Sequence, residues 1–263
     1  MMGATAVSLA RRDLILLLGA LGGLVALCWW YLIDMARGMA GMADMDGMIG
    51  AMGVRPWTNA DFLMMFGMWA VMMVAMMVPT AVRSVLIFAQ IGARAAARDR
   101  PFVSGYWFTA GYVVIWTVFS AAATLLQWAL DQAALLSPTM VSSSSYLGAL
   151  LLLSAGAWQL SPVKDACLRH CRSPAMYLAT HFRPGFSGAV HLGIRHGMYC
   201  LGCCWLLMGL LFVGGVMNLV WIAAITAFVL VEKLLPATLG VSWLAGWGMI
   251  VAGAGYLTWG LVN

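Results

Sequence analysis

Charged residues are scarce in this sequence. Asp, Glu, Lys and Arg make up 9% of the 263 residues, whereas hydrophobic residues make up 63%. An ordinary soluble domain carries roughly 25% charged residues, so this composition excludes one. Uncharged runs of about twenty residues are typical of transmembrane helices, and several occur along the chain. The sequence therefore predicts an all-α, polytopic transmembrane helix bundle.

The uncharged runs predict about seven spans within a single membrane domain, residues 1–263. The run at 197–231 is too long for one span at about 1.5 Å per residue. Gly214, Gly215 and Asn218 interrupt it, so it divides into two helices. The predicted spans cover residues 14–33, 62–82, 105–130, 146–163, 197–216, 219–235 and 241–262. Two connections are long enough to carry chemistry, an outer loop at 34–61 and an inner loop at 164–196.

Basic residues orient the predicted bundle, because Lys and Arg concentrate in cytoplasmic loops. With a cytoplasmic N-terminus, all 14 Lys and Arg residues except Arg37 and Arg55 fall on the inner side. Membrane topology thus explains the net charge of +5. Membrane lipid is the expected surrounding, and no nucleic-acid partner is indicated. The sequence has no Walker loop, dinucleotide-binding glycine pattern or Ser–His–Asp context, which favours a function other than catalysis.

Cysteine and histidine gather in one part of the chain. Five of the six cysteines lie between 167 and 204, and all four histidines lie between 170 and 196. The spacings of three and four residues place these cysteines on shared helix faces, and thiolates select Cu(I), zinc or iron–sulfur clusters. The predicted metal ligands are Cys167, Cys171, Cys200, Cys203, Cys204 and Met208, with His170 and His196 as ligands or supporting groups.

Two further polar residues accompany this cluster. Glu232 ends the sixth predicted span; it either lies at the cytoplasmic interface or orients a ligand near the thiols. Asn218 lies between the fifth and sixth spans, where it caps or reorients a helix end.

The methionines also recur at helical spacing among the 21 in the chain. Met39, Met42 and Met45 belong to a set in the outer loop, and Met68, Met72 and Met76 form a four-residue ladder in the second span. A thioether binds Cu(I) outside the cytoplasm, where thiols would oxidise. Methionine also serves as an apolar filler or in a surface helix. If the methionines are ligands, the sequence predicts a path for Cu(I) across the membrane, with thioethers on the outer side and thiols on the inner side.

Three stretches carry a resemblance to a family. They are MWAVMMVAMMVPT at 68–80, KDACLRHCRSP at 164–174 and GMYCLGCCWLLMGLLFVGGVMNLVWIAAITAFVLVEKLLP at 197–236. In these motifs the chain resembles an uncharacterised family of bacterial proteins described as predicted metal-binding integral membrane proteins. The resemblance implies a metal role in the bacterial inner membrane. It leaves the metal to ligand chemistry, which favours Cu(I) over zinc.

Three functions fit these observations. The first is Cu(I) import or delivery to a partner, such as a copper chaperone or a copper-dependent membrane enzyme. The second is a membrane thiol–disulfide oxidoreductase, because Cys200-x-x-Cys203 has the spacing of a redox motif. The third is an accessory subunit of a membrane complex, in which a structural metal such as zinc joins two helices.

Overall fold

The computed structural model describes residues 11–46, 56–97, 104–137 and 140–262, with only the backbone described over 39–46. All regular elements in this part are helices, which confirms the all-α prediction. They are α1 (Arg11–Asp46), α2 (Asn59–Ala96), α3 (Gly105–Gln132), α4 (Ser145–Gln159), α5 (Pro162–Arg172), α6 (Pro174–Thr180), α7 (Phe186–Gly209), α8 (Leu211–Gly214), α9 (Leu219–Leu234), the 3-10 helix η1 (Ala237–Leu239) and α10 (Val241–Val262).

Five helical segments in the described part are long and apolar enough to cross a membrane. They are Arg11–Gly38, Asn59–Ala96, Gly105–Gln132, Phe186–Gly214 and Ala237–Val262. The pair α4 and α5, bent by 66°, would make a sixth. α4 has 15 residues and α9 has 16, fewer than the ~20 of a full span. The predicted count of seven therefore remains a prediction.

The segment 164–196, expected to be a loop, contains most of α5, all of α6 and the start of α7. Pro162 lies in the first turn of α5, and Ser161 caps that helix through its side chain. Proline disfavours a helical conformation in the residue before it, which explains the break between α4 and α5. α7 begins after Gly185, whose φ of 93° is accessible to glycine. Within the outer loop expected at 34–61, α1 continues to Asp46.

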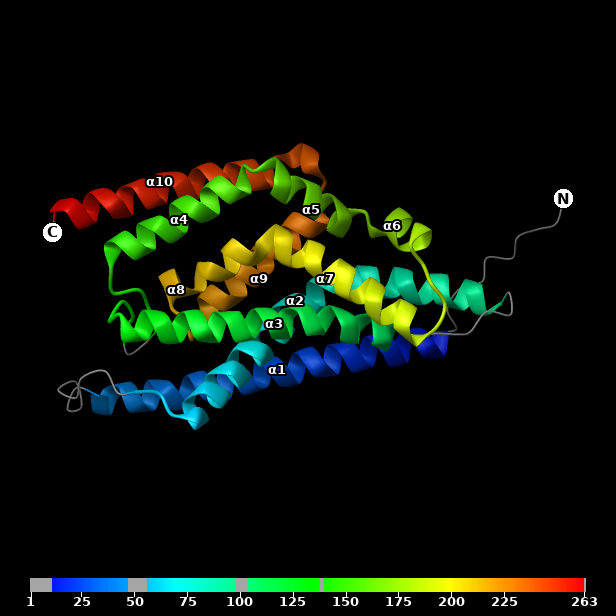
Figure 1. The fold of residues 1–263 in the computed structure, drawn as a ribbon, viewed down its shortest axis with the longest axis horizontal. Coiled ribbons are helices and arrows are strands. Elements are labelled where there is room, and N and C mark those ends of the chain that lie inside the picture. Colours follow the sequence, from blue (N-terminus) through cyan, green and yellow to red (C-terminus); the bar gives the residue numbers. More distant parts are fainter. Residues whose placement is uncertain (1–10, 47–55, 98–103, 138–139, 263) are drawn as a thin grey trace.

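The helices form an elongated bundle in which α1 and α10 lie on opposite outer sides (Figure 1). α10 packs along α4, and α3 packs against both α2 and α7. The contact between α3 and α7 brings two backbones together at glycines. A Cβ atom at Gly193 would meet the carbonyl oxygen of Phe108, and one at Gly111 would meet that of Val190. These glycines therefore set the distance between the two helices that carry much of the central core.

Candidate metal centre

Four cysteine thiols lie together in the core between α5 and α7. We call Cys171, Cys200, Cys203 and Cys204 the thiol cluster; all four are free and buried. The thiol of Cys200 interacts with the other three, and that of Cys171 also interacts with Cys203. The helical spacing of three and four residues places the α7 cysteines on one face, and α5 brings Cys171 against them. Two sequence-distant groups thus form one set of sulfur donors.

Cys167 lies at the edge of this set. It is partly exposed, and its Sγ would lie 2.9 Å from a Cβ atom placed on Gly202 of α7. The absence of a side chain at Gly202 therefore makes room for the Cys167 thiol. Cys167 lies one helical turn before Cys171, on the more accessible side of the cluster.

Cys200 has two polar partners from other helices. The Nζ atom of Lys233 on α9 donates to Cys200 Sγ at 3.0 Å, and the hydroxyl of Tyr112 on α3 lies 3.0 Å from the same sulfur. Lys233 also donates to Thr80 Oγ1 on α2 at 2.7 Å. A buried ammonium requires a charged or hydrogen-bonding partner. This arrangement places a cation where it can balance a thiolate at Cys200.

The remaining α7 thiols face their own backbone. Cys203 and Cys204 donate to the carbonyl oxygen of Cys200, at 3.0 and 2.9 Å. Within the described residues, no group of three or more His, Cys, Asp and Glu side chains is already arranged to hold a metal ion. In other staggered χ1 rotamers, the Sγ atoms of Cys203 and Cys204 would point away from the α7 backbone. The donors fit a thiophilic metal chemically, once these two thiols give up their backbone hydrogen bonds.

A buried ion pair lies at the end of α9 beside the cluster. Lys164 Nζ contacts both carboxylate oxygens of Glu232, at 2.6 and 2.8 Å, and the two side chains are 1% and 2% exposed. Gln159 donates to the same carboxylate at 3.0 Å, and Arg172 donates to the Glu232 carbonyl at 2.8 Å. Glu232 is therefore buried and paired with a lysine. Its role near the thiols remains a prediction.

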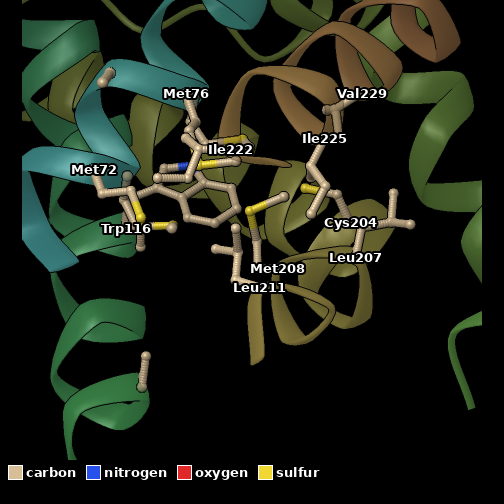
Figure 2. Packing of buried hydrophobic residues seen from close by; sticks show 14 of the residues in the cluster. Met72, Met76, Trp116, Cys204, Leu207, Met208, Leu211, Ile222, Ile225 and Val229 are labelled. Atoms are coloured by element: carbon tan, nitrogen blue, oxygen red, sulfur yellow. The ribbon is translucent and has the colours of Figure 1, made fainter. Parts of the chain in front are cut away.

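The methionine ladder of α2 meets the thiol cluster in one core. Met68, Met72, Met76 and Met208 are fully buried and belong to the same hydrophobic cluster as Cys200 and Cys204. Figure 2 shows Met72, Met76 and Met208 gathered around Trp116, with Cys204 nearby. The thioethers and thiols are thus neighbours. The sequence alone left this open, because it gave no distance between α2 and α7.

The other predicted residues include three methionines, a histidine and an asparagine. Met39, Met42 and Met45 fall within α1, but their side chains lie outside the described residues. The ring of His170 stacks on Tyr199 with centroids 4.0 Å apart, and its Nδ1 bonds the Ala166 carbonyl. Asn218 caps α9 by accepting from the Trp221 amide at 3.2 Å.

His196 is buried one turn before Cys200, between the rings of Phe108 and Tyr112. Its Nδ1 atom has no hydrogen-bond partner. A neutral imidazole with an unpaired nitrogen in the core is a group that can support or join a metal site after a small movement.

Tyr112 and Lys164 are the important residues that sequence reasoning missed. Tyr112 is 88 residues from its partner Cys200, so no spacing in the chain indicates their contact. Lys164 carried a signal, since a charge at the end of a predicted span is a candidate functional group. The charge bias places it at the start of the predicted inner loop, whereas the structure buries it against Glu232.

A family model described as "PpoB2: Copper chaperone" matches residues 66–256. The matched range includes the thiol cluster, the α2 methionine ladder, Lys233 and Glu232, whereas the α1 methionines precede it. Neither the curated proteins nor the solved structures contain a match.

Proposed function

The chain belongs to the PpoB2 copper chaperone family, and from that premise we propose that it is an integral membrane protein that binds Cu(I) at the thiol cluster and delivers it to a partner. One observation carries the proposal: four buried thiols from two helices adjoin a lysine ammonium and a methionine-rich core. Copper is the cargo of the site. The partner is a copper-dependent membrane enzyme or a second copper chaperone.

The ligands suit Cu(I) in softness and in charge. Thiolate and thioether sulfur are the side chains that select Cu(I) among the common metals. A Cu(I) ion held by two thiolates has a net charge of −1, and Lys233 lies at one of these sulfurs. The ion, its two thiolates and the ammonium then form a neutral group, which avoids the cost of an unpaired buried charge.

The buried methionines provide a route to the thiols. Met68, Met72 and Met76 lie four residues apart and share one face of α2. Met208 lies one turn after Cys204 on α7, and its side chain is grouped with Met72 and Met76 (Figure 2). Thioethers carry no proton to release, so Cu(I) moves among them without a change in protonation. A thiolate then binds the ion more strongly than a neutral thioether does.

We also propose that the bundle crosses the bilayer about seven times with its N-terminus in the cytoplasm. The starts of α1, α3 and α7 lie at one end of the bundle with the end of α2 (Figure 1). Arg11 and Arg94 belong to these segments, and Arg183 lies shortly before the start of α7. Basic residues at one end support that end as the cytoplasmic one.

Burial counts against the thiol–disulfide oxidoreductase. Cys200 is 1% exposed, so the disulfide of a protein substrate cannot approach its sulfur. Attack by a thiolate requires access to the disulfide. A monovalent ion that travels between side chains has no such requirement.

The test is Cu(I) binding by the purified full-length protein, measured against a chromogenic Cu(I) chelator under reducing conditions. A Cys200→Ser/Cys203→Ser variant should lose the tightly bound Cu(I). Cys28→Ser is the matched control, because Cys28 is also a buried cysteine but lies on α1. It should bind as the unmodified protein does. Equal Cu(I) affinity in the double variant and the control would refute the thiol site.

A further inference from the structure

A second group of sulfur atoms lies near the start of α2, away from the thiol cluster. The side-chain amide of Gln127 on α3 donates to Met65 Sδ at 3.5 Å and to Met140 Sδ at 3.3 Å. The indole of Trp69 donates to the oxygen of the same amide at 2.6 Å. Trp69 therefore fixes which way the amide points, and the amide nitrogen holds two thioethers from different segments at one point.

Simple core packing does not account for this arrangement. Gln127 is 1% exposed, and burying an amide is costly unless its hydrogen bonds are good. Thioether sulfur is a weak acceptor, so it is a poor partner if its only task is to satisfy the amide. The arrangement is better explained if the amide serves to position the two sulfurs. Each sulfur then keeps a lone pair for another ligand.

The backbone of Met140 supports the same conclusion. Its φ is 57°, a conformation that costs non-glycine residues about 1–3 kcal/mol. Glycine or asparagine would relieve this strain. The connection between α3 and α4 nevertheless has methionine there, and its side chain reaches Gln127.

We propose that Met65 and Met140 form a second binding site, for a soft monovalent cation, from which the ion enters the methionine ladder. The inference rests on the proposed Cu(I) function and adds an entry site to it. Met68, Met72 and Met76 continue from Met65 along α2 in steps of three and four residues. The distance from Met65 to Met76 is about 16 Å at 1.5 Å per residue, so the ladder connects the two sites.

An acidic residue lies where an ion would approach. Asp131 is one helical turn beyond Gln127, so both lie on one face of α3. Its carboxylate accepts a hydrogen bond from the Trp57 indole at 2.8 Å. A carboxylate near the end of the bundle raises the local concentration of cations, whereas the thioethers select the soft ones.

The experiment measures how many Ag(I) ions, a redox-inert substitute for Cu(I), the purified full-length protein retains after desalting. The background carries Ser in place of all five cysteines of α5 and α7. In it, we expect one Ag(I) per chain to remain, and Met65→Leu/Met140→Leu to abolish it. Leucine preserves volume approximately. The matched control is Met64→Leu on the same turn of α2, since Met64 is 51% exposed; it should retain the ion.

The same Met65→Leu/Met140→Leu change in the cysteine-containing protein should reduce bound Ag(I) by one per chain and leave the affinity of the thiol cluster unchanged. This comparison decides the question if the protein with the five serine substitutions does not fold. Equal Ag(I) retention with and without the two methionines would overturn the second site. Failure of the Cys200→Ser/Cys203→Ser variant to lose tightly bound Cu(I) would instead overturn the proposed function, so the two failures are distinct.

Discussion

Replacing Lys233 with methionine should weaken Cu(I) binding without unfolding the protein. Lys233 is buried, and its ammonium donates to Cys200 Sγ at 3.0 Å and to Thr80 Oγ1 at 2.7 Å. A hydrogen bond to a charged group contributes about 1.5–3 kcal/mol, and each ~1.4 kcal/mol is a factor of ten in affinity. Lys233→Met should therefore raise the dissociation constant for Cu(I) about 10- to 100-fold.

The assay is competition with a chromogenic Cu(I) chelator, with the folded state of each variant checked by thermal unfolding in the same detergent. Lys233→Arg keeps the charge and should recover part of the affinity. Thr80→Val removes the other acceptor of the ammonium but leaves the contact with Cys200. It should therefore have a smaller effect than Lys233→Met. If folded Lys233→Met binds Cu(I) as tightly as the unmodified protein, the charge does not stabilise the bound ion.

Three other predictions follow from the packing. Glu232→Gln leaves the Lys164 ammonium buried without its carboxylate and should destabilise the protein by about 3–5 kcal/mol. The double variant Lys164→Met/Glu232→Gln should recover most of the lost melting temperature. Equal melting temperatures for the single and double variants would contradict this reasoning. Gly193→Ala places a methyl group against the Phe108 carbonyl and should cost about 1–3 kcal/mol, measured as a lower melting temperature. In the folded protein Cys167 should react with maleimide before any buried cysteine, which mass spectrometry of timed samples can test.

Composition and residue spacing predicted the class of fold well, because both are local properties of the chain. Runs without charge indicate membrane helices wherever they occur. The spacing of Cys200, Cys203 and Cys204 places them on one face of any helix that contains them. The methionine ladder of α2 was predictable for the same reason.

Helix boundaries were less predictable, because they depend on local breaks and on packing. Pro162 near the end of the predicted span at 146–163 shortens α4 and turns the chain into α5. The segment before Gly197 was expected to be a loop because it contains Arg195 and His191. Ala189, Leu192 and His196 nevertheless lie on one buried face of α7, where the glycine contacts with α3 compensate for a polar outer face.

The electrostatic part of the site was invisible in the sequence because it depends on contacts between distant helices. The charge bias placed Lys233 on the inner side with the other basic residues but gave it no partner, and Tyr112 carried no signal. Only the packing of α3, α7 and α9 brings the ammonium and the phenol to Cys200. Sequence reasoning identifies candidate metal donors in such a protein more readily than the groups that could balance their charge.

That charge balance also limits how many thiolates each of the two candidate metals could have in the cluster. Lys164 and Glu232 neutralise each other, so Lys233 supplies one positive charge to the thiol cluster. A Cu(I) ion with two thiolates has a charge of −1 and is neutralised by Lys233. A Zn(II) ion with four thiolates, the usual closed structural site, has a charge of −2 and would leave one buried negative charge unpaired. An unpaired buried charge is strongly unfavourable. We therefore expect the cluster to exclude a Zn(II) site of four thiolates, because Lys233 alone neutralises either Cu(I), the proposed cargo, with two thiolates or Zn(II) with three.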